Sequence, residues 1–125
     1  MSMFKGSPFG ELARLRDVST KRVSSWDKTG GNMDYLVIQP GEQATLADIK
    51  GAGCINHIWC THSSQSQDYL RKAVLRAKWD GEEEYSINVP LGDFFGMGHA
   101  KCVNFSSAPL QMSPADGRGF NCWFP

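Results

Sequence analysis

The stretch LRKAVLRAKWDGEEEYSINVP, residues 70–90, decides the fold. Its leucine, arginine, lysine and alanine residues all favour a helix. Apolar and basic side chains nevertheless alternate strictly, with Ala73, Leu75, Ala77 and Trp79 on one face and Lys72, Arg76 and Lys78 on the other. Asp80-Gly81 is a typical hairpin turn before a second apolar run, EYSINVP. The stretch therefore predicts a half-exposed β-hairpin.

Short apolar runs with a period near two lie on both sides of this hairpin. Strands are predicted at DYLVIQ (34–39), EQATLADI (42–49), CINHIWCTH (54–62) and KCVNF (101–105). Helical spacing occurs at FGELARLRD (9–17), which predicts one or two helical turns. Many short strands separated by turn residues favour an all-β fold, a β-sandwich of the jelly-roll type.

The size and the charge of the chain limit the classes of function that it can have. The chain has 125 residues, 41% of them hydrophobic, which suits one domain or one lobe of a larger protein. Thirteen basic residues balance thirteen acidic ones, so nucleic acid and membranes are not predicted partners, whereas a neutral ligand fits. No apolar run approaches the roughly 20 residues that span a bilayer, and the beginning lacks the apolar core of a secretory signal. A cytoplasmic location is therefore expected.

The four cysteines, Cys54, Cys60, Cys102 and Cys122, are enough for two disulfides, but their apolar and aromatic neighbours favour buried free thiols. Cys54, His57, Cys60 and His62 raise a zinc hypothesis. On a strand, however, His57 points away from Cys60 and His62, so these groups do not converge on one ion. The sequence predicts packing roles for them, with no metal site and no cofactor.

The segment SSWDKTGGNMDY, residues 24–35, has the composition of a ligand-binding loop. Gly30-Gly31 allows a sharp turn that brings Asp27, Asn32 and Asp34 together beside the ring of Trp26. Such mixtures bind sugars, because rings cover their apolar faces while carboxylates and amides bond their hydroxyl groups. The alternative is a capped surface turn in which Asp and Asn bond neighbouring backbone. The sequence leaves both interpretations open.

Further polar groups stand in glycine-rich loops after the hairpin. Asp93 follows a predicted strand at a bend, where it faces a cleft or caps the next turn. Arg118 and Asn121 belong to SPADGRGFN (113–121), a second loop able to contact hydroxyl groups. His99, beside Gly98, is the histidine with the most site-like surroundings.

Four segments together resemble one bacterial family: SSWDKTGGNMDY (24–35), IQPGEQATLADIKGAGCINHIW (38–59), YLRKAVLRAKWDGEEEYSINVPLGDFF (69–95) and MSPADGRGFNCWFP (112–125). The family is glycoside hydrolase family 172, and the resemblance runs from about Arg22 to Pro125. It implies two jelly rolls per full-length protomer, of which this chain is the first. It also implies homo-oligomers, trimers or multiples of trimers, that act on α-D-arabinofuranosyl or α-D-fructofuranosyl groups.

The resemblance also suggests roles for parts of the chain. Residues 1–21 are expected to form an arm with a short helix, and residues 22–125 a jelly-roll domain. Substrate binding is carried over to the loop positions that match the family motifs: Trp26, Asp27, Asn32, Asp34, Asp93, Arg118 and Asn121.

Catalysis is not carried over to any residue. The paired catalytic glutamates of the family are expected beyond Pro125, and the acidic run 82–84 reads as a solvated hairpin tip. The aromatic ending, GFNCWFP (119–125), agrees with a longer protein or with a terminus that docks on a partner chain. Whether this chain is an enzyme is left open. The alternative is a non-catalytic module for carbohydrate binding or oligomer assembly.

Overall fold

The structure is a computed structural model that describes residue 12 and residues 14–113 and 116–125. The chain divides into two compact units, Met1–Gly51 and Ala52–Pro125. Every α-helix and β-strand of the described residues lies in the second unit. None of these helices has the length and apolar character needed to cross a membrane.

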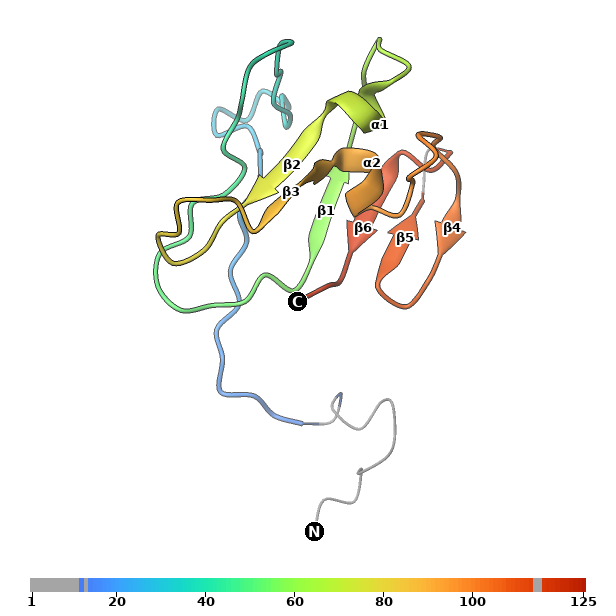
Figure 1. The fold of residues 1–125 in the computed structure, drawn as a ribbon. Coiled ribbons are helices and arrows are strands. Elements are labelled where there is room, and N and C mark those ends of the chain that lie inside the picture. The colour runs from blue at the N-terminus through green and yellow to red at the C-terminus, as the bar shows by residue number, and fades with distance from the viewer. Residues whose placement is uncertain (1–11, 13, 114–115) are drawn as a thin grey trace. The chain divides into compact units, whose positions relative to one another are not determined.

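The second unit contains two antiparallel sheets and two short helices (Figure 1). The four-stranded sheet has the order β1-β6-β5-β4 and consists of β1 (Ile58–Thr61), β4 (Phe105–Ser106), β5 (Leu110–Met112) and β6 (Gly119–Cys122). The two-stranded sheet consists of β2 (Val74–Ala77) and β3 (Ile87–Pro90). Helix α1 (Tyr69–Lys72) precedes β2, and helix α2 (Leu91–Phe94) follows β3. The predicted all-β class is confirmed, while the jelly-roll connectivity stays a prediction.

The hairpin of β2 and β3 forms as predicted. Leu75 pairs with Val89 and Ala77 with Ile87, and Glu82 N donates to Trp79 O at 2.9 Å across the turn. Asp80 and Gly81 have φ angles of 47° and 79°, the positive values that a type I′ turn requires. Leu75 and Ala77 are half-buried while their strand neighbours are exposed, which confirms the alternation within β2. Ala73 and Trp79, predicted for the same face, lie outside the strand and are exposed.

The beginning of the same stretch differs from a strand. Leu70, Arg71 and Lys72 belong to helix α1, and the Lys72 ammonium pairs with the Asp68 carboxylate at 3.1 Å. Leu70 is only 1% exposed, so one helical turn places its side chain in the core. The helix propensity of these residues therefore prevails where a buried contact rewards it.

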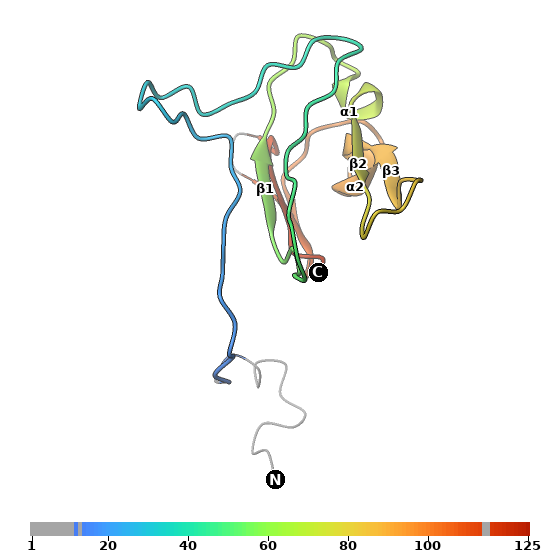
Figure 2. The same cartoon turned by 90° about the vertical axis from the view of Figure 1, so that its left-hand side faces the viewer.

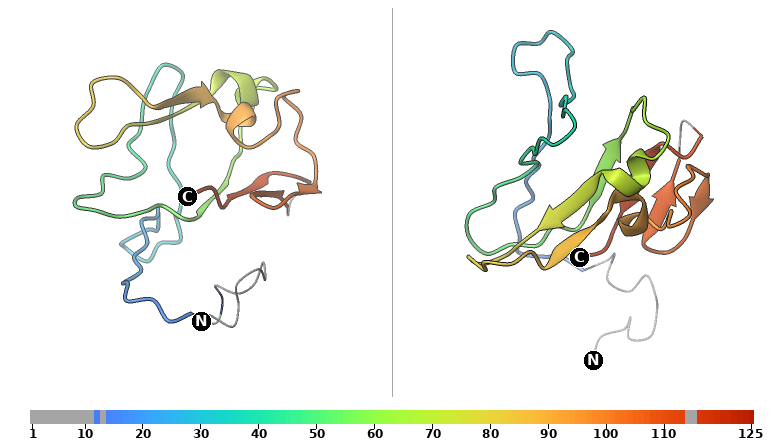
Figure 3. Two further views of the ribbon diagram at one scale, coloured as in Figure 1. Left: turned by 60° about the horizontal axis from the view of Figure 1, so that its bottom comes forward. Right: turned by 45° about the horizontal axis from the view of Figure 1, so that its top comes forward.

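The core lies between the four-stranded sheet and the layer formed by the two helices and the hairpin. Figures 2 and 3 show these two layers facing each other. Phe95 and Phe120, from the two layers, are 1% and 0% exposed, and their ring centroids lie 5.1 Å apart. The remaining buried apolar residues are Leu70, Leu91, Met97, Leu110, Met112 and Cys122. Burial of this set removes apolar surface from water and holds the layers together.

The first unit has a different character. Predicted strands 34–39 and 42–49 do not form, although the turn between them does, with Glu42 N donating to Gln39 O at 3.0 Å. Leu36, Val37 and Ile38 are 52%, 66% and 50% exposed. An alternating pattern gives a strand only where a partner strand accepts its backbone hydrogen bonds and a layer covers its apolar face. The described part of this unit supplies neither.

Other predicted elements are shifted. Strand 54–62 shortens to β1, strand 101–105 is replaced by β4 at Phe105–Ser106, and β5 appears inside a predicted loop. In the short helix expected at 9–17, residues 9–11 and 13 lie outside the described residues, and residues 14–17 are not helical. The boundary after residue 21 stays a prediction.

Candidate functional site

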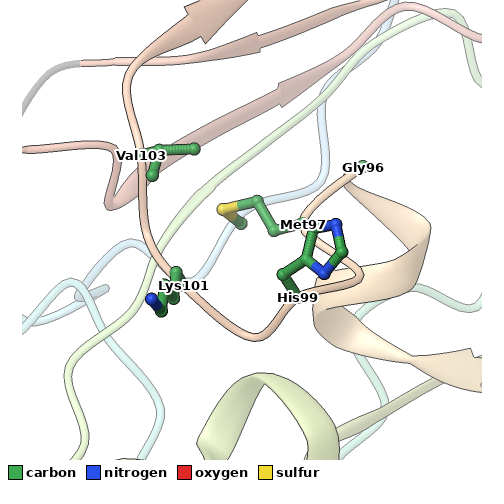
Figure 4. Close-up of a pocket in the computed structure, with 5 residues that line it drawn as sticks. All are labelled: Gly96, Met97, His99, Lys101 and Val103. Atoms are coloured by element: carbon green, nitrogen blue, oxygen red, sulfur yellow. The ribbon is translucent and has the colours of Figure 1, made fainter.

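A pocket of about 460 Å³ opens along the loop between α2 and β4. We call it the α2–β4 pocket, and it is lined by Gly96, Met97, His99, Lys101 and Val103. Figure 4 shows the loop curving around the space between Met97 and Val103. Met97 is 3% exposed and joins the core, whereas His99 and Lys101 are exposed. The pocket therefore has an apolar base and a basic rim.

Backbone hydrogen bonds fix the start of this loop. Gly96 N donates to Asp93 O at 3.1 Å, and Met97 N donates to Gly92 O at 2.6 Å. Gly96 has a φ of +76°, and a Cβ there would lie 3.1 Å from the side chains of Leu110 and Phe105. Only glycine satisfies both the angle and the close approach. The loop is thus anchored to the core before it reaches His99.

Asp93 stands beside this pocket. Its carboxylate forms an ion pair with the Arg71 guanidinium of α1, and it lies 3.7 Å from the position that a Cβ on Gly98 would occupy. Both partners are partly exposed, with 49% of the Arg71 side chain and 36% of the Asp93 side chain accessible. The negative charge of Asp93 is therefore balanced by Arg71, which the sequence did not single out.

The turn before β6 packs against the same loop. Asp116 and Gly117 have φ angles of 54° and 80°, and Ser113 N donates to Gly119 O at 2.8 Å. A Cβ on Gly117 would lie 2.5 Å from the carbonyl of Val103, so the turn rests directly on the backbone of the pocket wall. The structure thus brings the Arg118 turn and the Asp93 loop to one region.

Tyr69 and Cys102 form a part-buried polar pair next to the pocket-lining loop. Tyr69 Oη and Cys102 Sγ lie 3.0 Å apart. Cys102 stands between the pocket residues Lys101 and Val103 in the sequence, and its side chain is half-buried. Burial and this hydrogen bond raise the pKa of Tyr69, while the nearby charge of Arg118 acts in the opposite direction. Arg118 is therefore close enough to influence the phenol group behind the pocket.

Asn121 has a different environment. It lies in the middle of β6 and is 9% exposed. Its Oδ1 lies 3.2 Å from His57 Nε2, and its Nδ2 donates to Gln111 O at 3.3 Å. The amide therefore joins neighbouring strands, whereas the sequence placed it in a loop.

The four predicted residues of the first unit lie in one turn. The Asp27 carboxylate accepts from Thr29 N at 2.9 Å, Thr29 Oγ1 at 2.7 Å and Met33 N at 3.2 Å. Asp34 Oδ1 accepts from Asp27 N at 2.7 Å. The Thr29 side-chain hydrogen bond is the main cause that lowers the pKa of Asp27. These contacts match the capped-turn alternative.

Trp26 and Asn32 complete this turn without those hydrogen bonds. Trp26 is 56% exposed and, with Arg22 and Ser24, lines a second hollow of about 420 Å³. Asn32 has a φ of +63°, which Asn tolerates better than most residues. The exposed indole is thus available to a ligand.

The zinc hypothesis can also be compared with the geometry. Cys60 Sγ lies 3.1 Å from His62 Nε2 on the core side, whereas the ring of His57 stacks on Trp123. The predicted opposition of His57 and His62 is confirmed. Burial and the neighbouring Cys122 raise the pKa of Cys60 to about 12, so this thiol stays protonated. No cluster of three or more metal-ligating side chains occurs within the described residues.

The cysteines are free thiols with unequal exposure. Cys122 is buried, Cys60 and Cys102 are half-buried, and Cys54 is exposed. The expectation of burial is therefore wrong for Cys54, whose segment lies just before β1 and outside the core.

A family profile described as GH172 domain-like matches residues 29–125. The chain belongs to this family. The match confirms the resemblance drawn from the four sequence segments, and it makes the chain a glycoside hydrolase-related domain. No curated protein matches the chain.

The GH172 domain has pocket residues that the sequence did not predict. Met97, Lys101 and Val103 carry no motif of their own, and each becomes a lining residue because the loop curves back on itself. His99 was singled out because it stands beside Gly98 in a predicted loop, and it does line the pocket. Neither His99 nor Lys101 forms a side-chain hydrogen bond or ion pair with the described residues. Both remain available to a ligand.

Proposed function

We propose that this GH172 domain binds furanoside groups, α-D-arabinofuranosyl or α-D-fructofuranosyl, for a glycoside hydrolase whose catalytic glutamates lie in a second jelly roll. The observation that carries the proposal is the α2–β4 pocket, with two unpaired donors above an apolar base. The family match supports the carbohydrate class. Among the predicted binding residues, Asp93 and Arg118 lie in the two segments that border this pocket.

The pocket chemistry suits a small sugar ring. Met97 and Val103 offer apolar surface to the C–H face of the ring, while His99 and Lys101 donate hydrogen bonds to its hydroxyl oxygens. A retaining glycosidase needs two carboxyl groups roughly 5 Å apart, and the Asp93 carboxylate is already paired with Arg71. The role proposed for this chain is therefore to bind and orient the substrate. By itself the chain is proposed not to catalyse hydrolysis.

The test is binding of methyl α-D-arabinofuranoside and of an α-D-fructofuranosyl disaccharide to the whole chain, followed by NMR chemical-shift changes. His99→Ala and Lys101→Ala are each expected to weaken binding about tenfold, because each removes one hydrogen-bond donor. Lys78→Ala, on the exposed hairpin, is the matched control and should bind like the unchanged chain. Equal affinity in all four proteins would exclude the pocket as the sugar site.

The loop of the first unit has a separate test. In a form of the protein extended by the second roll, Asp27→Ala is expected to weaken substrate use without unfolding the protein, and Trp26→Ala more so because its ring is 56% exposed. Full activity of both variants in a hydrolysis assay would show that this loop does not contact substrate. Asn32 and Asp34 would then be assigned to the turn alone.

An assembly role is the second candidate. The exposed run Leu36–Ile38 in the first unit is unusual for a monomer and favours a partner surface. We propose homo-oligomers, trimers or multiples of trimers. Sedimentation of the chain would support this by showing a concentration-dependent trimer that Val37→Asp weakens; a monomer at all concentrations would contradict it.

A further inference from the structure

The face of the four-stranded sheet that points away from the core carries aromatic and amide side chains. Ile58 and Cys60 of β1 pack against the core, as do Phe120 and Cys122 of β6. Because side chains alternate along a strand, Trp59 and its pairing partner Asn121 lie on the other face.

Two more rings extend this face. His57 precedes β1 and Trp123 follows β6, and their rings stack with centroids 4.9 Å apart and planes 3° apart. We call the set His57, Trp59, Gln111, Asn121 and Trp123 the aromatic face. It shares no residue with the α2–β4 pocket.

Hydrogen bonds hold the aromatic face in place. The Asn121 amide, 9% exposed, lies at its base and bonds both the His57 ring and the Gln111 carbonyl. His57 in turn supports the Trp123 ring, and Trp123 N donates to Pro109 O at 2.8 Å. The rings of His57 and Trp123 are therefore oriented before a ligand arrives, so binding loses less conformational entropy.

Exposure and charge indicate what kind of ligand fits. Trp59 and Trp123 remain 59% and 42% exposed, although the Asn121 amide beneath them is bonded. The strand positions that share this face in β1, β6, β5 and β4 (Thr61, Gly119, Gln111 and Ser106) carry no Lys, Arg, Asp or Glu. A flat, uncharged surface of rings, amides and hydroxyls does not attract a phosphate backbone or an acidic lipid. It suits a ligand that is uncharged, with apolar faces and hydroxyl edges.

We propose that the aromatic face is a second carbohydrate-binding surface, which holds an uncharged oligosaccharide chain by stacking on Trp59 and Trp123. The choice of a saccharide rests on the proposed function, while the surface itself rests on ring exposure, ring orientation and lack of charge. Diagonal neighbours on adjacent strands lie about 7–8 Å apart, so the two indoles offer contacts to more than one sugar unit.

The experiment measures binding of two uncharged probes, an arabinofuranose oligosaccharide and cellohexaose, to the whole chain by isothermal titration calorimetry. Trp59→Ala is expected to lower the affinity for the oligosaccharide probes about tenfold, because one stacking ring is lost. Trp79→Ala, which removes a ring that is 47% exposed beside the hairpin turn, is the matched control and should leave affinity unchanged. Circular dichroism confirms that each variant is folded.

The outcomes separate this inference from the proposed function. If His99→Ala weakens binding and Trp59→Ala does not, the aromatic face is not a sugar site and the pocket proposal stands. If Trp59→Ala weakens binding of oligosaccharides and His99→Ala does not, the inference stands alone. If neither probe binds, the inference is overturned. The inference is also overturned if the chain associates with itself and Trp59→Ala makes it monomeric, because a second copy would then occupy the face.

Discussion

The two units of this chain contain similar apolar patterns and reach different structures. In the second unit, alternating runs form paired strands over a core that includes Phe120, 0% exposed. In the first, the run Leu36–Ile38 stays at least half exposed and no described residue joins a strand. The difference shows that period two specifies a strand only when another strand and a covering layer are present.

The largest expected effect tests this contrast directly. Phe120→Ala should destabilise the protein by about 3–5 kcal/mol, because it leaves a cavity among fully packed side chains. Val37→Ala, at 66% exposure in the first unit, should change stability by no more than about 0.5 kcal/mol. Urea unfolding followed by tryptophan fluorescence measures both. A comparable loss from Val37→Ala would mean that the first unit also has a packed core.

A pair of glycines sharpens the comparison. Gly117 and Gly41 have φ angles of 80° and 83°, but a Cβ on Gly117 would lie 2.5 Å from the Val103 backbone while one on Gly41 meets nothing within 4 Å. Gly41→Ala should therefore cost about 1–2 kcal/mol, from the backbone angle alone. Gly117→Ala adds a backbone clash and should cost about 3 kcal/mol or more.

Thermal unfolding of the two alanine variants distinguishes these contributions. Equal losses would show that the turn before β6 shifts freely away from the pocket wall. In that case Arg118 would not be held in a fixed position beside the α2–β4 pocket.

The smallest effects depend on pH. Desolvation lowers the pKa of His62 below its ordinary value of 6.5, so the folded protein binds this proton less readily than the unfolded chain. Stability should therefore fall as the pH drops from about 7 to 5 and level off below the folded pKa. Denaturant midpoints measured across this range should show the fall, and His62→Gln should reduce it. A pH response that His62→Gln leaves unchanged would contradict this.

Asp27 provides the corresponding case in the first unit. Its pKa is lowered from 3.8 by hydrogen bonds from Thr29 and Met33, so its contribution is complete at neutral pH and is lost in acid. NMR signals of the Asp27 turn should change below about pH 4 while signals of the core strands do not. Simultaneous changes in both regions would mean that the units unfold together.

The sequence predicted the hairpin and singled out one pocket-lining residue, for local reasons. The Asp80-Gly81 turn and the alternation after Val74 predicted the hairpin, and the position of His99 beside Gly98 in a loop marked one residue that lines the pocket. Met97 and Val103 were not predictable, because the shape of the loop depends on the close approach of Gly96 to Leu110 of β5 and of Gly117 to the Val103 backbone. Arg71 was missed for the same reason, since its pairing with Asp93 depends on how α1 and α2 meet.

By itself, the sequence determined the family, the all-β class and the local turns, since these depend on motifs and on angles set within a few residues. Only the tertiary structure decided which alternating runs became strands, which face of β6 carries Asn121, and which loops meet around the α2–β4 pocket. Those outcomes require hydrogen bonds and packing between residues far apart in the chain. The free energy of these contacts arises only when the layers come together, so no short segment of the sequence encodes it.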